Sequence, residues 1–194
     1  MGDAFGPPLK VGKNKVNKII AIYLISIFSL LSNISIAKDT FERGNLKDVI
    51  NFYQITANIG TGGQPTISQF SKISEAGYSV VINLAMHNSN NAIAEEGEVV
   101  SSLGMEYAHI PVPFEAPTSI HLKKFFDLMD SFDGKKIFVH CAVNARASVF
   151  MHKYLTLQKR LPFERSISPY LNQWLPTMDS NWRRMMEMEW EEIK

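Results

Sequence analysis

The sequence has 194 residues, of which 45% are hydrophobic and 20% charged, with a formal net charge of +1 at pH 7. This length suits one domain with an extension, and the balanced composition argues against a nucleic-acid-binding protein and against a disordered chain. The chain has a single cysteine, which cannot form an internal disulfide, so the fold must depend on its hydrophobic core.

Residues 1–37 differ in character from the rest of the chain. Four lysines precede an apolar run over residues 19–31, and the small residues Ser35 and Ala37 follow. This pattern is typical of a secretory signal peptide. The alternative is an uncleaved membrane anchor, because residues 19–37 are nearly long enough to span a bilayer. The sequence therefore predicts an exported protein, periplasmic or secreted, or one held at the inner membrane through residues 19–37.

Residues 38–194 show apolar runs alternating with amphipathic segments, a rhythm that predicts an α/β domain. This part has 16 basic and 18 acidic residues, a net charge of −2, so no basic surface for nucleic acid is expected. Continuous apolar triplets, such as the one that begins at Val80, suit strands buried on both faces of a mainly parallel sheet. The expected strands are residues 53–57, 79–84, 106–112 and 136–140.

Helical segments lie between and after these strands, and several begin or end at capping residues. Thr66 with a glutamine three residues later forms a capping-box pattern, and Gly77 is placed to end that helix. Thr118 is placed to cap another helix, and a further helix should begin just after Asn144. The expected helices are residues 67–76, 94–103, 119–131, 145 to about 159, 164–173 and 179–192.

The turn after the last expected strand carries the chemistry of the chain. His140 ends the strand, Cys141 follows, and Arg146 comes at the start of the next helix. Open α/β sheets bind ligands at the carboxyl ends of their strands, and the amides of such a turn can surround an anion. The helix dipole, these amides and the Arg146 guanidinium all favour a thiolate over a thiol. The residues expected to bind an anion through their amides are Ala142, Val143, Asn144 and Ala145.

Four short sequence strings follow one another in a characteristic order: residues 61–66, 81–84, 109–112 and 139–141. In this order they resemble the protein tyrosine and dual-specificity phosphatase superfamily, and in particular a small bacterial group with a shortened loop. The resemblance runs from about Tyr53 to Trp182. It implies an enzyme that hydrolyses phosphate monoesters, with Cys141 as nucleophile, Arg146 as phosphate clamp and His140 as buried support. It implies a phosphorylated protein or small molecule as substrate, and neither a metal nor an organic cofactor.

The chain departs from the usual family pattern at the loop itself. Four residues separate Cys141 from Arg146, where most members have five. Ala147 stands where a hydroxyl often stabilises the leaving thiolate, and Ser148, one position later, is the candidate for that supporting role. Asn144 sits in the middle of the turn, where it tolerates positive φ better than most residues.

The general acid is a second departure. The family supplies an aspartate from a loop before a helix, but residues 111–118 contain no aspartate and only one acid, Glu115. Glu115 is therefore either the general acid or a solvated loop residue. The polar loop over residues 87–91 also follows a strand on the expected active side, where it is either a plain surface loop or a contributor to substrate choice.

Two other functions remain open at this point. Rhodanese-type sulfurtransferases also place a cysteine loop between a strand and a helix, and their persulfide chemistry needs no general acid. The adjacent His140 and Cys141 and the string over residues 63–66 favour the phosphatase. An inactive phosphate-binding domain is the second alternative. The residues at positions Pro113, Asn144 and Ala147 are compatible with it.

Overall fold

The protein was analysed as a computed structural model in which residues 46–193 are described. Residues 1–37, the expected signal peptide or anchor, lie outside the described residues. Within residues 46–193, none of the helices combines the length and the apolar character needed to cross a membrane.

A five-stranded sheet lies at the centre of the described fold, with strand order β1-β2-β5-β3-β4. Only β1 is antiparallel to its neighbour; the pairs β2–β5, β5–β3 and β3–β4 are parallel. This mainly parallel α/β sheet confirms the expected fold class. The strands are β1, Tyr53–Thr56; β2, Ile59–Gly62; β3, Val80–Asn83; β4, Glu106–His109; and β5, Ile137–His140.

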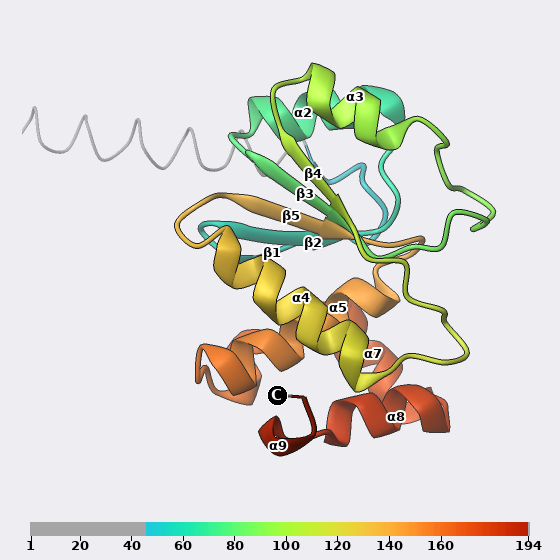
Figure 1. The fold of residues 1–194 in the computed structure, drawn as a ribbon, viewed down its shortest axis with the longest axis vertical. Helices are drawn as coiled ribbons and strands as arrows, with labels where there is room; N and C mark the ends of the chain where they lie inside the picture. Colours follow the sequence, from blue (N-terminus) through green and yellow to red (C-terminus); the bar gives the residue numbers. More distant parts are fainter. Residues whose placement is uncertain (1–45, 194) are drawn as a thin grey trace, which may run out of the picture. The chain divides into compact units, whose positions relative to one another are not determined.

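Helices cover both faces of the sheet (Figure 1). α2 and α3 lie on one face, and α4, α5 and the helices that follow lie on the other. The helices are α2, Ile67–Glu75; α3, Glu96–Ser102; α4, Ser119–Ser131; α5, Ala145–Lys153, continued by a π-helical stretch, Tyr154–Gln158; α6, Phe163–Ser166; α7, Pro169–Trp174, continued by a 3₁₀ turn, Leu175–Thr177; α8, Ser180–Glu187; and α9, Trp190–Ile193.

The helix ends follow the capping residues identified in the sequence. The Thr66 side chain accepts a hydrogen bond from the backbone N–H of Gln69, and the Gln69 side chain accepts one from the backbone N–H of Thr66. Gly77 follows α2 with φ +84°, a backbone angle that favours glycine. Thr118 caps α4 with its side chain, as expected, although here His121 completes the box.

The C-terminal region is more broken than the sequence suggests. The expected helix over residues 164–173 is divided into α6 and α7, because Ile167 and Ser168 are extended. Proline disfavours helical backbone in the residue before it, so Pro169 explains the break and begins the new helix. The expected helix over residues 179–192 is likewise divided, at Met188, whose backbone is not helical.

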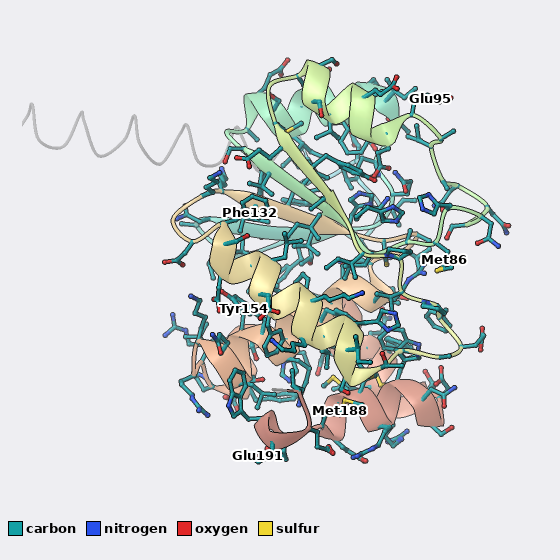
Figure 2. The ribbon with its side chains drawn as sticks, viewed as in Figure 1. Met86, Glu95, Phe132, Tyr154, Met188 and Glu191 are labelled. Atoms are coloured by element: carbon teal, nitrogen blue, oxygen red, sulfur yellow. The ribbon has the colours of Figure 1, made fainter. Side chains whose placement is uncertain are left out.

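Alternating residues of the central strands supply two hydrophobic cores. Val81 of β3 packs with α2 and α3, while Val80 and Ile82 face the larger cluster that contains α4, α5 and α8. Trp182 of α8 is fully buried in that larger cluster. Figure 2 shows side chains filling the space between the sheet and both helix layers. The sheet is therefore buried on both faces, as its apolar triplets predict.

Strand β2 is the element that the sequence analysis does not anticipate. Its sequence, Ile-Gly-Thr-Gly, lacks an apolar run, and two glycines normally weaken a strand. Here the glycines are required by close neighbours. A Cβ on Gly60 would lie 2.3 Å from the Tyr78 hydroxyl oxygen, and one on Gly62 would lie 2.9 Å from the Phe138 ring. Tertiary packing against two aromatic side chains thus decides this strand.

Candidate active site

The turn from Cys141 to Arg146 joins β5, in the middle of the sheet, to α5 on the face covered by α4. Asn144 is the N-cap of α5 and has φ +76°, the left-handed conformation expected for it. Its side chain is buried and donates hydrogen bonds to the backbone oxygen of Asn51 at 2.7 Å and to Thr61 Oγ1 at 3.3 Å. Asn144 therefore fixes the sharpest point of the turn to β2 and to the chain before β1.

The outer side of the turn is fixed by hydrogen bonds to its carbonyl groups. The Ala142 oxygen accepts from the backbone N–H of Gln64 at 3.1 Å and from Asn91 Nδ2 at 3.0 Å. The Val143 oxygen accepts from Asn51 Nδ2 at 2.9 Å. In a trans peptide the C=O and the N–H of the next residue point in opposite directions. The N–H groups of Val143 and Asn144 therefore point away from the donors that bind these two carbonyls.

Arg146 lies in the first turn of α5 with only 5% of its surface exposed. Its Nη1 donates a hydrogen bond to the Val112 backbone oxygen at 2.9 Å, and its guanidinium lies 5.9 Å from the centre of the Phe114 ring. The buried Nε has no hydrogen-bond partner among the described residues. A buried N–H without a partner is costly, so this donor is available to an acceptor from a ligand or from water.

Cys141 is fully buried and unpaired. Tyr170 of α7 is half-buried on the side of the larger core. Burial, and then the negative charge of a Cys141 thiolate, raise the pKa of the Tyr170 hydroxyl above its ordinary value. The sequence analysis assigns no role to Tyr170.

A buried carboxylate, that of Glu96 in the first turn of α3, stands behind the turn. It accepts hydrogen bonds from Asn83 Nδ2 at 2.8 Å, from the Tyr107 hydroxyl at 3.0 Å and from His140 Nε2 at 3.1 Å. The Gln64 amide Nε2 donates to its second oxygen. The donors come from β3, β4, the end of β5 and the loop after β2, so one side chain ties together four segments around Cys141.

The surroundings of Glu96 favour its ionised form. Burial alone would raise its pKa, but the hydrogen bond and charge of His140, with hydrogen bonds from Gln64 and Tyr107, outweigh burial and lower the pKa below its usual value. Burial and the Glu96 charge in turn raise the pKa of Tyr107. His140 is fully buried. Its ring is held by an anion through Nε2, directly before Cys141 in the chain.

The loop that holds Glu115 lies next to Arg146 and is anchored through its backbone. Trp182 Nε1 donates to the Phe114 oxygen at 2.9 Å, and Asn181 Nδ2 donates to the Glu115 oxygen at 2.8 Å. The Glu115 side chain is exposed and has no hydrogen bond or ion pair with a described residue. The fold thus brings the Glu115 segment to the site and leaves its carboxylate in solvent.

Ser148, the other expected supporting residue, lies one turn into α5. Its hydroxyl shares a 2.8 Å hydrogen bond with the hydroxyl of Ser168, which caps α7. Both residues are buried. Ser148 therefore links α5 to α7, the helix that carries Tyr170, and its hydroxyl is bonded to Ser168 rather than to the Cys141 thiol.

The sequence analysis locates the turn and names His140 as its buried support, but it does not identify the carboxylate that accepts a hydrogen bond from His140. Glu96 is one of three glutamates at the start of α3, and nothing in the local pattern distinguishes it from Glu95 or Glu98. Asn91 belongs to the polar loop over residues 87–91, for which the sequence leaves both a plain surface loop and a contribution to substrate choice open, and its side chain donates a hydrogen bond to the turn. Within residues 46–193, no group of three His, Cys, Asp or Glu side chains could hold a metal ion.

The fold and the turn together define the class of protein. A mainly parallel sheet covered by helices on both faces matches the fold of the protein tyrosine phosphatase-like superfamily, and the cysteine turn lies between the central strand β5 and α5. Residues 36–166 match the family model of "DSP-PTPase phosphatase fused to NAD+ Kinase", and the chain belongs to this family of dual-specificity and tyrosine phosphatases. The resemblance noted in the sequence is thereby confirmed.

Solved structures agree with this assignment. A putative phosphatase (DUF442) from Shewanella putrefaciens CN-32 is 32% identical, with a TM-score of 0.68, over 74% of this chain and 93% of that chain. Two others share the fold at lower identity. The core catalytic domain of the PP-IP phosphatase SIW14 from S. cerevisiae is 16% identical (TM-score 0.58, 71% of this chain, 84% of that one). PTPMT1 in complex with PI(5)P is 14% identical (TM-score 0.58, 70% and 92%). A comparison with curated proteins finds no match.

Proposed function

We propose that this protein is a cysteine-dependent phosphatase that hydrolyses phosphate monoesters through a phosphocysteine intermediate. Cys141 is the nucleophile, Arg146 and the amides of residues 142–145 bind the phosphoryl oxygens, and His140 orients the turn. Membership of the phosphatase family supports this function. The observation that most supports this proposal is the Nε of Arg146, a buried donor without a partner among the described residues, in the turn that follows a buried free thiol.

The reaction takes place in two steps. In the first, the Cys141 thiolate attacks phosphorus, a sulfur–phosphorus bond forms, and the bond from phosphorus to the ester oxygen breaks. Glu115 gives its proton to the departing oxygen. In the second, Glu115 takes a proton from water, the water oxygen attacks phosphorus, and inorganic phosphate leaves as the thiolate is regenerated. Arg146 stabilises the charge on the phosphoryl oxygens in both steps through two-pronged hydrogen bonding.

The test compares two activities in one preparation of the full-length protein. An aryl phosphate should be hydrolysed, and thiosulfate should not support sulfur transfer to cyanide. Acid quenching during turnover, followed by mass spectrometry, should find a phosphate on the peptide that contains Cys141. Sulfur transfer in place of phosphate release would reject the phosphatase. Phosphate binding without turnover would reduce the protein to a phosphate-binding domain.

We further propose that residues 1–37 direct the protein out of the cytoplasm. The basic, apolar and small-residue pattern of this segment supports a signal peptide, and an inner-membrane anchor is the alternative. Expression of the complete chain in a bacterium, followed by fractionation and N-terminal sequencing, tests this assignment. A new N-terminus after Ala37 in the periplasm would indicate cleavage, and an intact chain in the membrane fraction would indicate an anchor. An intact chain in the cytoplasm would reject export.

A further inference from the structure

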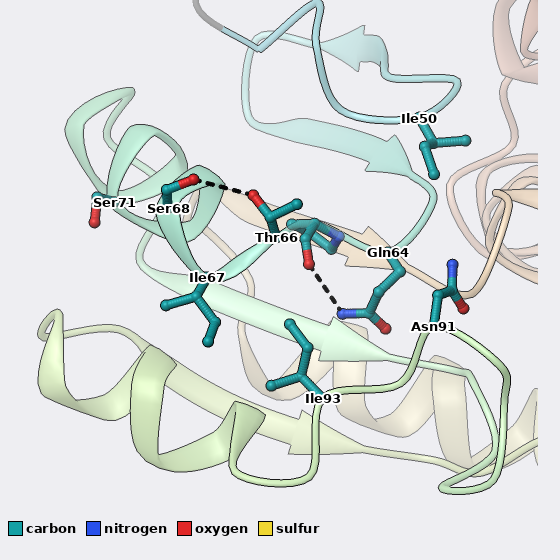
Figure 3. A pocket seen from close by; sticks show the side chains of 9 residues that line it. Ile50, Gln64, Thr66, Ile67, Ser68, Ser71, Asn91 and Ile93 are labelled. Atoms are coloured by element: carbon teal, nitrogen blue, oxygen red, sulfur yellow. Dashed lines mark hydrogen bonds between the residues drawn. The ribbon is translucent and has the colours of Figure 1, made fainter.

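The Cys141 turn and the Glu115 loop (residues 110–118) are held by side chains from different elements. On the outer side of the turn, Gln64 and Asn91 line an open groove beside α2 (Figure 3). The backbone N–H of Gln64 and the side chain of Asn91 donate hydrogen bonds to the Ala142 oxygen. The Glu115 loop is held instead by α8 (Figure 1), from a residue 66 positions later in the chain. The placement of Glu115 therefore depends on a helix that takes no part in the turn.

Two successive residues in the first turn of α8 donate hydrogen bonds to two successive carbonyl groups of the loop. Asn181 Nδ2 donates to the Glu115 oxygen at 2.8 Å, and Trp182 Nε1 donates to the Phe114 oxygen at 2.9 Å. Successive side chains leave a helix roughly 100° apart around its axis. Two bonds that arrive from different directions restrain the orientation of this loop segment as well as its position.

The Phe114 ring adds packing to these hydrogen bonds. Its centre lies 5.3 Å from that of Trp182 and 6.0 Å from that of Trp174. The Arg146 guanidinium lies 5.9 Å from the same ring, and Arg146 Nη1 donates to the Val112 oxygen. Arg146 and α8 therefore contact the same short segment, so the loop is attached both to the proposed phosphate clamp and to α8.

Helix α8 is itself fixed to α5. Lys153 of α5 is 5% exposed, and its Nζ donates hydrogen bonds to the Met186 oxygen at 2.9 Å and to the Met188 oxygen at 2.5 Å. These are carbonyl groups at the C-terminal end of α8, which lack partners within the helix. Trp182 is also buried against Phe150 of α5, with ring centres 6.2 Å apart. The helix that carries Arg146 therefore also sets the position of α8.

We propose that Asn181 is a positioning residue for proton transfer: by holding the Glu115 oxygen, it keeps Glu115 where its carboxylate can reach the departing oxygen. The inference rests on the proposed phosphatase function and deepens it by assigning the placement of the acid to α8. The exposed Glu115 side chain has no hydrogen bond or ion pair with a described residue, so its reach is set by its backbone. Asn181 bonds to the loop rather than to the Cys141 turn, so phosphate binding does not depend on it.

Asn181→Asp in the full-length protein is the direct test. The new side chain has the same shape but cannot donate, because a carboxylate only accepts. An acid in the first turn of α8 suits the helix dipole, so the helix itself is not weakened. For alkyl phosphates, kcat/KM should fall about tenfold, the effect of losing roughly one hydrogen bond. For aryl phosphates with good leaving groups, which need little proton donation, it should change less than about twofold.

Two further variants separate placement of the acid from other causes. Ser180→Asp puts the same charge on the exposed neighbouring residue of α8 and should leave both kinds of substrate unaffected. Asn181→Asp combined with Glu115→Gln should slow alkyl phosphates no more than Glu115→Gln alone, because Asn181 acts through Glu115. The inhibition constant of inorganic phosphate should be the same in all of these proteins and in wild type.

An equal loss for alkyl and aryl phosphates, weaker phosphate inhibition, a further loss in the Glu115→Gln background or the same loss in Ser180→Asp would overturn the positioning role. Hydrogen exchange of the peptide over residues 112–118 reports on the attachment without turnover, and it should be faster in Asn181→Asp. An active wild type whose leaving-group dependence is unchanged by Asn181→Asp would remove the positioning role alone. A wild type that releases no phosphate would reject the phosphatase function, and the positioning role with it, even where exchange depends on Asn181.

Discussion

The two segments that meet at the proposed phosphate site are held in different ways. The turn from Cys141 to Arg146 is fixed by hydrogen bonds to its carbonyls, by the Asn144 side chain and by a buried carboxylate behind His140. The loop with Glu115 is anchored by hydrogen bonds to its backbone oxygens and by the Phe114 ring, which packs against Trp174 and Trp182, while the Glu115 side chain is exposed. If the proposed mechanism holds, the fold itself fixes the groups that bind the anion, whereas the proposed proton donor is an exposed side chain.

The largest expected effect is that of Cys141→Ser. The hydroxyl is a much weaker nucleophile than a thiolate, so aryl phosphate turnover should fall by at least about 10⁴-fold. Phosphate or vanadate binding should persist, because the amides and Arg146 remain. Stopped-flow or steady-state assays measure the first quantity, and isothermal titration measures the second. Substantial residual turnover would remove Cys141 from the chemistry.

Arg146→Lys tests whether the planar guanidinium binds two phosphoryl oxygens at once. Lysine keeps the positive charge but cannot bind two oxygens with parallel hydrogen bonds, nor hold Val112 in the same way. We expect kcat/KM to fall about 10²–10³-fold, with binding of phosphate weakened as well. Full activity of the lysine variant would show that the geometry of the fork is not used. Arg183→Lys, in α8, provides a control for the chemical change alone.

Glu96→Ala should lower stability more than any exposed substitution. It leaves four donors around an empty site, including His140, and a single buried donor without a partner costs about 1–3 kcal/mol. Chemical denaturation measures the loss. Glu98→Ala, in the same helix, is the control and should stay within about 0.5 kcal/mol of wild type, because surface substitutions of this kind have small effects. Equal stability of the two variants would contradict the role given to Glu96.

The same carboxylate predicts how stability depends on pH. The pKa of Glu96 is lower in the folded protein than its usual value of 4.5, so its contribution is fully present above that value. This contribution is lost as the pH falls through the folded-state pKa, because below that pH the carboxylate is protonated in both the folded and the unfolded protein. Urea unfolding between neutral and acidic pH should show this loss in wild type and a smaller one in Glu96→Gln. Parallel curves would show that Glu96 does not titrate differently in the two states.

Glu115→Gln should have the smallest effect, and it should depend on the leaving group. A phenolic group that leaves well needs little proton donation, so its rate should change less than about threefold, while an alkyl phosphate should slow by about 10²-fold. A plot of the hydrolysis rate against the pKa of the leaving group, for wild type and variant, measures this difference. Glu164→Gln, an exposed glutamate in α6, is the control. The same response to both kinds of substrate would exclude Glu115 as the general acid.

The local features of the chain were accessible to sequence reasoning because their causes are local. Strand β3 follows from a continuous apolar run, and Thr66 begins α2 because its hydroxyl reaches the amide three residues on. The left-handed backbone of Asn144 follows from a turn too tight for most side chains. The order of strand, cysteine, short turn and arginine also lies within a few residues, so the proposed site was located before the fold was known.

The remaining features depend on residues far apart in the chain. Gly60 and Gly62 lie in a strand because β2 pairs with β1 and β5, and glycine is needed there because Tyr78 and Phe138 leave no room for a side chain. Glu96 becomes the buried anion because His140, 44 residues later in the sequence, faces it in the folded protein. Sequence alone determined an α/β chain of the phosphatase-like class with a nucleophile candidate in its turn. Only tertiary structure decided which acid supports that turn and which surface lies beside it, because burial and pairing are set by contacts between segments rather than by the pattern within one.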